Sequence, residues 1–216
     1  MRKLILFFIV GLLCSCQIQY DVSTRYVFEG QVLDRDGNPI ENHSIEAWVY
    51  NSYDSDLIGF TETNSDGYYE LVIPKPKNER DFEIKIKGNA VYFQKAYVNI
   101  YESDLSDHKI TIGKTTLFAH DDISNLEITL NQINPENNIS AIELTGLIAE
   151  QIIWVNPPEE EPYTPYYYEF YAKKVAKNQT LNLYYEVRNG NTGQTNSFNE
   201  LIDVSSNDIT EYTINY

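Results

Sequence analysis

Residues 26–40, YVFEGQVLDRDGNPI, and residues 61–73, TETNSDGYYELVI, decide the fold that we expect for this chain of 216 residues. In each stretch an Asp-Gly pair, at 36–37 and at 66–67, stands between runs in which apolar and polar side chains alternate. Glycine takes a positive φ without a Cβ clash, so Asp-Gly favours a tight hairpin turn. Alternation with a period of two is typical of a strand with one buried face. The two stretches therefore predict strands joined by hairpins.

The same alternation runs through the rest of the chain. In residues 81–87, DFEIKIK, the side chains of Phe82, Ile84 and Ile86 point one way and the charged side chains the other. No long window has a helical repeat with caps, and residues 101–107 are at most one helical turn. We expect strands over residues 26–33, 44–50, 57–63, 68–73, 82–87, 93–101, 109–118, 126–131, 139–147, 151–155, 166–173, 180–188, 197–204 and 210–216. Short strands broken by turns indicate an all-β chain of antiparallel sandwiches.

One polar stretch divides the predicted strands into two groups. Residues 131–138, NQINPENN, contain Pro135 and lack alternation, so we interpret them as a domain linker. We expect a first sandwich over residues 25–132 and a second, similar to immunoglobulin or fibronectin domains, over residues 133–216. A single large sandwich is the alternative, because chain length sets only a soft prior on the number of domains.

The start of the chain predicts export. Residues 2–3, Arg-Lys, precede an apolar run at residues 4–13. This run is too short to span a hydrocarbon core, which takes about 20 apolar residues in a helix, but it suits a signal peptide. Residues 13–16, LCSC, resemble a bacterial lipobox, in which the last cysteine receives diacylglycerol. An ordinary signal peptide that ends in cysteines is the alternative.

These features predict the processing and the location of the protein. We expect a signal peptide over residues 1–15, lipid attachment at Cys16 and a tether over residues 16–24. The chain has two cysteines, Cys14 and Cys16, so a metal or redox site at this pair lacks further cysteine ligands. The expected location is the outer membrane, with the protein held by its lipid and facing either the periplasm or the cell surface.

The order of the two turn motifs resembles the carboxypeptidase regulatory-like domains, which are transthyretin-like (prealbumin-like) sandwiches. The matching parts are Gly30-x-Val32, the turn at residues 34–40 and the turn with its following strand at residues 61–69. The resemblance covers roughly residues 25 to 130 and implies a Greek-key sandwich that assists folding or recognition and has no catalytic residues. A lipoprotein leader before such a domain is similar to small outer-membrane lipoproteins of Bacteroidetes-type bacteria. The second half of the chain resembles no family.

The charge of the chain argues against nucleic acid as a partner. Asp and Glu number 32 against 16 Lys and Arg, which gives a net charge of −16. So large an acidic excess is repelled by phosphate backbones and by anionic headgroups. Contact with the membrane is therefore expected to come from the lipid on Cys16.

No motif predicts catalysis or a cofactor. The three histidines lie in polar stretches, and HExxH, Gly-x-Ser-x-Gly and phosphate-binding glycine loops are absent from the sequence. Residues 34–38, DRDGN, are similar to the start of a calcium loop, but Pro39 follows and no glutamate closes the loop. Asn64 and Asp66 would add oxygens if both turns lay at one end. We favour plain turns and expect no metal and no catalytic residue.

Candidate binding residues gather in a proline-rich segment at residues 154–171, WVNPPEEEPYTPYYYEFY. Rigid, partly exposed aromatic side chains stack on sugar rings or anchor a protein partner, because they bury a large area at low entropic cost. The candidates are Trp154, Tyr163, Tyr166, Tyr167 and Tyr168. The alternative is that alternation buries Tyr166, Tyr168 and Phe170 and that the segment is a plain connection.

The expected function is therefore that of a non-catalytic surface lipoprotein. It would serve as a binding or accessory module in glycan handling, nutrient uptake or adhesion, with a glycan or an outer-membrane protein as partner. The alternative is a structural subunit of a fimbria-like assembly that gives or accepts a strand, with residues 210–216 as the strand to test. The sequence leaves the oligomeric state open.

Overall fold

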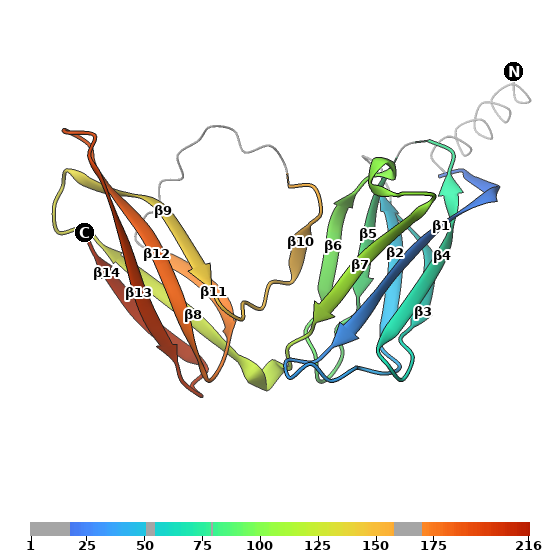
Figure 1. Ribbon diagram of the computed structural model, residues 1–216, viewed down its shortest axis with the longest axis horizontal. Helices are drawn as coiled ribbons and strands as arrows, with labels where there is room; N and C mark the ends of the chain where they lie inside the picture. Colours follow the sequence, from blue (N-terminus) through green and yellow to red (C-terminus); the bar gives the residue numbers. More distant parts are fainter. Residues whose placement is uncertain (1–17, 51–54, 79, 158–169) are drawn as a thin grey trace, which may run out of the picture. The chain divides into compact units, whose positions relative to one another are not determined.

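The computed structural model describes residues 18–50, 55–78, 80–157 and 170–216. These residues form fourteen strands, no α-helix and two short 3₁₀ turns, η1 (Glu102–Asp104) and η2 (His120–Asp122), so the all-β class is confirmed (Figure 1). In this part of the chain, no helix has the length and apolar character needed to cross a membrane.

The chain forms two compact units. The first comprises the described part of residues 1–88 with Gln94–Thr116 and Ile152–Pro157, and the second comprises Asn89–Phe93, Leu117–Gln151 and the described part of residues 158–216. The boundary expected between residues 132 and 133 therefore falls inside the second unit. The polar stretch at residues 131–138 connects two strands of that unit, β8 (Ile123–Asn131) and β9 (Asn137–Thr145). Polarity and a proline mark a loop, but they do not show whether that loop joins sheets or domains.

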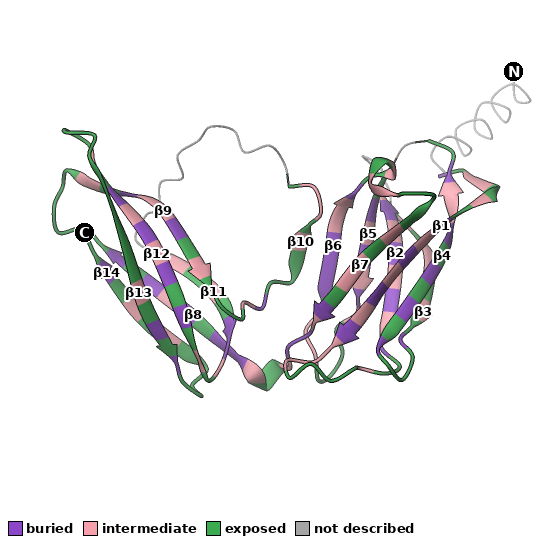
Figure 2. Cartoon of the chain, viewed as in Figure 1, coloured by how far each residue is buried: buried purple, intermediate pink, exposed green. Residues whose placement is uncertain are grey.

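The first unit is a sandwich of two sheets. One sheet has the order β4 (Tyr68–Pro76), β1 (Tyr20–Leu33), β7 (Lys109–Thr116), and the other the order β10 (Ile152–Trp154), β6 (Lys95–Ile100), β5 (Asp81–Ile86), β2 (Ser44–Tyr50), β3 (Ser55–Glu62). Phe28 of β1 and Phe82 of β5 bring their ring centroids to 5.7 Å across the interface, and both are buried. Along β5 the predicted alternation is confirmed, because Phe82, Ile84 and Ile86 are all buried (Figure 2).

Both Asp-Gly turns are tight, but neither joins two neighbouring strands of one sheet. Gly37 has φ +85° and Gly67 φ +74°, as expected for left-handed turn positions. However, the turn at residues 34–40 leads from β1 to β2, and the turn at residues 64–67 leads from β3 to β4, so each passes from one sheet to the other. The first turn closes a short antiparallel bridge between Leu33 and Pro39, but the strands expected to pair across each turn do not. Alternation fixes which face of a strand is buried and leaves its hydrogen-bonded partner undetermined.

The two turns lie side by side. The backbone N–H of Val32 donates to the carbonyl of Gly67 at 2.8 Å. The Asp34 carboxylate accepts the backbone N–H groups of residues 36 and 38 at 2.9 and 2.8 Å, and the Asn64 amide oxygen accepts those of residues 66 and 68 at 3.0 and 2.9 Å. These oxygens therefore accept hydrogen bonds from the backbone of their own turns, as expected for plain turns. Within the described ranges, no three His, Cys, Asp or Glu side chains gather closely enough to hold a metal.

The sheets are mixed, which corrects the prediction of purely antiparallel sandwiches. β7 runs parallel to β1, β10 parallel to β6, and β14 (Ile209–Asn215) parallel to β8. Parallel neighbours need a long crossover between them. Alternation within a strand carries no information about such crossovers, so only the structure shows them.

The second unit is a sandwich of two three-stranded sheets. Their orders are β11 (Phe170–Ala176), β8, β14 and β13 (Thr195–Val204), β12 (Gln179–Asn189), β9. Leu126 and Ile128 of β8 and Leu181 and Leu183 of β12 are fully buried in one core. The strand named as a donor for assembly, residues 210–216, lies largely in β14, where Ile214 is buried in the same core. In this structure the chain keeps that strand for its own fold.

Two tyrosines of the second unit predict sensitivity to alkali. Tyr185 donates to Oε1 of Glu200 at 2.8 Å, and Tyr212 donates to Oε2 of the same carboxylate. Burial and then this hydrogen bond raise the pKa of Tyr212 to about 12, and the same causes raise the pKa of Tyr185. The folded state therefore holds these protons more tightly than the unfolded chain, whose tyrosines titrate near 10.

Their stabilising contribution is complete below pH 10 and is lost as the pH rises through about 12. We expect the urea midpoint of the second unit to fall across this range. It should fall less steeply in Tyr212→Phe, whereas Tyr68→Phe, at an exposed tyrosine of the first unit, should follow the wild type. Superimposable pH profiles for wild type and Tyr212→Phe would contradict this assignment.

Candidate functional site

The structure describes one of the predicted binding residues, Trp154. The remaining sequence candidates, Cys16, Tyr163, Tyr166, Tyr167 and Tyr168, lie outside the described residues. Lipid attachment and the tyrosine cluster therefore stay predictions.

Trp154 belongs to the first unit. Its strand, β10, was expected at residues 151–155 of a second domain, but it adds to the edge of the five-stranded sheet beside β6, with Ile152 opposite Ala96 and Trp154 opposite Val98. Just beyond β10, the Asn156 side chain donates to the carbonyl of Asn99 at 2.9 Å and to the carboxylate of Asp104 at 2.7 Å. The strand that presents Trp154 is thus held by backbone and side-chain hydrogen bonds.

The strand register places Trp154 on the same outward face as several other apolar side chains. Trp48 on β2 lies between Glu83 on β5 and Leu57 on β3. Glu46, also on β2, lies opposite Phe60 on β3, and Lys85 on β5 lies opposite Ala96 on β6. Residues directly opposite each other share one face of a sheet. We call this surface the aromatic face and define it by Trp48, Tyr50, Leu57, Phe60, Ile152 and Trp154. Phe60 is 75% exposed and Trp154 49% exposed.

Charged groups between these rings neutralise one another. The Lys85 ammonium lies 4.6 Å from the Trp48 ring centroid, donates to the Tyr50 hydroxyl at 3.0 Å and lies 3.5 Å from the Glu83 carboxylate. Burial lowers the pKa of Lys85, but the hydrogen bond to Tyr50 and the charge of Glu83 outweigh it, so the pKa is raised on balance. Lys85 therefore remains charged, and its cation–π contact fixes the position of the Trp48 ring.

A second ion pair lies on the same face. The Glu46 carboxylate accepts the indole N–H of Trp48 at 2.9 Å and pairs with Lys87 at 3.2 Å. Asp81 lies opposite Tyr50 and Glu62 opposite Ser44, so the face also carries two exposed carboxylates. The aromatic face therefore combines half-exposed rings and ion-paired hydrogen-bonding groups with a small acidic excess.

Sequence reasoning missed Trp48 and Tyr50, although the signal was present. In residues 44–50, SIEAWVY, alternation places Trp48 and Tyr50 on the same side as Glu46, which is the wet side of the strand. Aromatic side chains on a wet strand face are a signal for a binding surface. The position of Trp154 on the same face as Trp48 and Tyr50 could not be predicted in this way, because it depends on the parallel pairing of β10 with β6.

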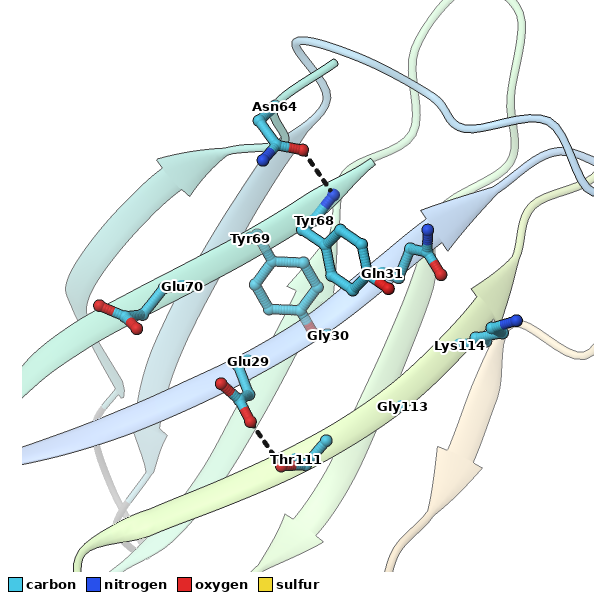
Figure 3. A pocket seen from close by; sticks show the side chains of 10 residues that line it. All are labelled: Glu29, Gly30, Gln31, Asn64, Tyr68, Tyr69, Glu70, Thr111, Gly113 and Lys114. Carbon is cyan, nitrogen blue, oxygen red and sulfur yellow. Dashed lines mark hydrogen bonds between the residues drawn. The ribbon is translucent and has the colours of Figure 1, made fainter. Parts of the chain in front are cut away.

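A second feature lies on the outward face of the other sheet, where a hollow of about 500 Å³ opens over β4, β1 and β7 (Figure 3). Its floor is formed by Gly30 of β1 and Gly113 of β7, which lie opposite each other. β7 has one extra residue, Ile112, between the pairs Glu29–Thr111 and Gly30–Gly113, and this bulge interrupts the ladder at the floor.

The described histidines have structural partners. His43 is buried, its Nε2 lies 2.7 Å from the carbonyl of Lys87, and burial lowers its pKa. Nε2 of His120 lies 3.0 Å from the carbonyl of Asn89, and its ring meets Phe93 edge-on with centroids 4.1 Å apart. The loop at residues 120–122 is therefore a packed connection between β7 and β8.

Comparisons with known proteins give no family. No model of a known protein family matches the chain, and no curated protein matches its sequence. Among solved structures, a lipoxygenase from Cyanothece PCC8801 is 20% identical over 53% of this chain with a TM-score of 0.33, and the chain spans only 20% of its length.

Two other structures are similar over most of the chain. A shaft pilin from Lactobacillus rhamnosus GG is 9% identical, with 89% of this chain and 98% of the pilin covered and a TM-score of 0.34. A putative adhesin from Bacteroides ovatus is 8% identical, with 93% of each chain covered and a TM-score of 0.27. At such low scores these likenesses carry no argument about function.

Proposed function

We propose that this protein is an exported lipoprotein, anchored through Cys16, that binds glycans at the aromatic face and performs no catalysis. The observation that carries the proposal is the alignment of Trp154 with Trp48 and Phe60 on one outward face of a sheet. The leader supports export and anchoring, and its lipid would keep the binding unit at the outer membrane.

The chemistry of the aromatic face favours a glycan over other ligands. One face of a sugar ring presents C–H groups, which pack on an aromatic ring, while its hydroxyls need hydrogen-bonding partners. Trp154 and Phe60 supply exposed rings, and the ion-paired Lys85 and Glu46 supply a donor and an acceptor. A nucleic acid would be repelled by the acidic chain. A sheet face is also extended and open, which suits a polymer better than a single small molecule.

Replacement of one exposed ring tests this proposal. We expect Trp154→Ala to weaken binding of the full chain to a neutral polysaccharide at least tenfold, which corresponds to about 1.4 kcal/mol, because it removes the ring at one end of the aromatic face. Phe170→Ala is the matched control, since Phe170 is 52% exposed but lies on β11 of the second unit. Screening on an array of envelope and host polysaccharides followed by titration calorimetry measures both variants.

Two results would contradict the proposal. One is a wild-type chain that binds no polysaccharide on the array. The other is a Trp154→Ala variant whose affinity equals that of Phe170→Ala. Polymerisation of the purified chain in place of glycan binding would favour the structural subunit expected as the alternative.

A further inference from the structure

The hollow over β4, β1 and β7 has a floor that lacks side chains for a structural reason. A Cβ added to Gly30 would lie 2.8 Å from the hydroxyl and 2.9 Å from two ring carbons of Tyr69, so the Tyr69 ring occupies the space where a side chain would be. Gly113 has φ +83°, a conformation that other residues rarely adopt. Both positions thus favour glycine, and a ligand can approach the backbone closely there.

Beneath this floor lies a buried hydroxyl without a partner. Tyr69 is 4% exposed, and its hydroxyl forms no hydrogen bond within the part of the chain that the structure describes. Figure 3 shows the ring among the residues that line the hollow, with its hydroxyl directed at Gly30. Burial raises the pKa of this group, which therefore stays protonated. Tyr69 lies directly opposite Gly30 and alternates with the outward Tyr68 and Glu70, so its ring packs on the core face of the sheet and supports the floor from below.

The walls of the hollow follow from the strand register. Glu70, Glu29 and Thr111 form one row across β4, β1 and β7. Tyr68, Gln31 and Lys114 form a second row across the same strands. The two rows therefore flank the pair of floor glycines on either side, and Tyr68, which is 54% exposed, presents its ring at one corner (Figure 3).

Charge in the hollow is balanced. The Glu29 carboxylate pairs with Lys109 at 2.5 Å and accepts the Thr111 hydroxyl at 2.7 Å, and these hydrogen bonds lower its pKa. The side chains of Glu70 and Lys114 make no hydrogen bond or ion pair with any other described residue. The hollow therefore offers one unpaired carboxylate on β4, one unpaired ammonium group on β7 and the phenol hydroxyl of Tyr68, with no excess of either charge.

We infer that this hollow binds a single neutral sugar ring, seated on Gly30 and Gly113 and stacked against Tyr68. A polyhydroxylated ring donates hydrogen bonds to Glu70 and accepts one from Lys114. An anion is repelled by Glu70 and a cation by Lys114, whereas a neutral polyol uses both. The volume of about 500 Å³ suits a ligand of this size. This site goes beyond the proposed function and does not depend on the aromatic face.

Titration of the full chain with single sugars tests the inference. The probes are glucose, galactose, mannose and N-acetylglucosamine, with glucuronic acid as the anionic and glucosamine as the cationic comparison, followed by NMR chemical shifts. We expect at least one neutral sugar to bind, and Tyr68→Ala and Glu70→Gln each to weaken that binding about tenfold or more. Val72→Ala is the matched control, because Val72 lies on the same face of β4, is 48% exposed and is not part of the hollow.

Tyr69→Phe gives a readout that separates ligand binding from packing. It removes the unpaired hydroxyl on the core face, so we expect a higher melting temperature of the free protein with unchanged sugar binding, whereas Tyr68→Ala and Glu70→Gln weaken the binding. Trp154→Ala should leave this binding unchanged, so that failure of the hollow and failure of the aromatic face are distinguishable. Preference for the acidic or the amino sugar, a wild-type affinity in Tyr68→Ala and Glu70→Gln, or no neutral sugar bound below about 10 mM would overturn the inference.

Discussion

Replacing Gly67 by alanine should lower the free energy of unfolding of the first unit by about 3 kcal/mol or more. Two costs combine at this position. The residue has φ +74°, which an L side chain rarely adopts, and its Cβ would lie 2.4 Å from the carbonyl oxygen of Val32. Because that oxygen belongs to the backbone of β1, relief requires the two adjacent turns to separate, which also strains the hydrogen bond from Val32 to Gly67.

Gly37→Ala is the matched control for this prediction. Gly37 occupies the equivalent place in the other turn with φ +85°, but a Cβ there meets nothing within 4 Å. Its replacement should cost only the left-handed conformation, about 1–2 kcal/mol. Both tryptophans, Trp48 and Trp154, lie in the first unit, so urea unfolding followed by tryptophan fluorescence reports on that unit alone. Equal losses of stability in the two variants would contradict the packing of the turns against each other.

Replacing Cys16 by alanine should move the protein from the membrane to the soluble fraction. If Cys16 carries the lipid, its acyl chains supply the membrane affinity, at about 0.8 kcal/mol for each buried CH₂ group. Cys14→Ala is the matched control, because it changes the neighbouring cysteine and leaves Leu13, Ser15 and Cys16 in place. We expect Cys14→Ala to sediment with membranes and incorporate labelled palmitate like the wild type, and Cys16→Ala to do neither. Membrane retention and labelling of Cys16→Ala would refute the lipoprotein assignment.

Strands were predicted well because their signal is local. The alternation in residues 82–87 places β5 within one residue of its position in the structure, and the wet and buried faces agree. The partners of the strands were not predictable by the same means. Both Asp-Gly turns join strands of different sheets, and β8 belongs to the second unit, because pairing depends on crossovers between distant segments.

The candidate sites were likewise predictable where their signal is local and unpredictable where they depend on strand pairing. Trp154 was found because an aromatic residue beside prolines is visible in the sequence, and Trp48 could have been found from its place beside Glu46. The union of Trp154 and Trp48 on one face requires β10 to pair with β6, which no local pattern encodes. The hollow likewise depends on the register that sets Gly30 opposite Gly113 and on the bulge at Ile112.

Hydrogen–deuterium exchange of the full chain, with and without the polysaccharide that it binds on the array, tests the central claim most directly. The backbone amides of β3 and β10, the edge strands that carry Phe60 and Trp154, should exchange more slowly in the complex, while those of β12 and β13 in the second unit should be unchanged. Protection confined to the second unit, with β3 and β10 unaffected, would contradict glycan binding at the aromatic face.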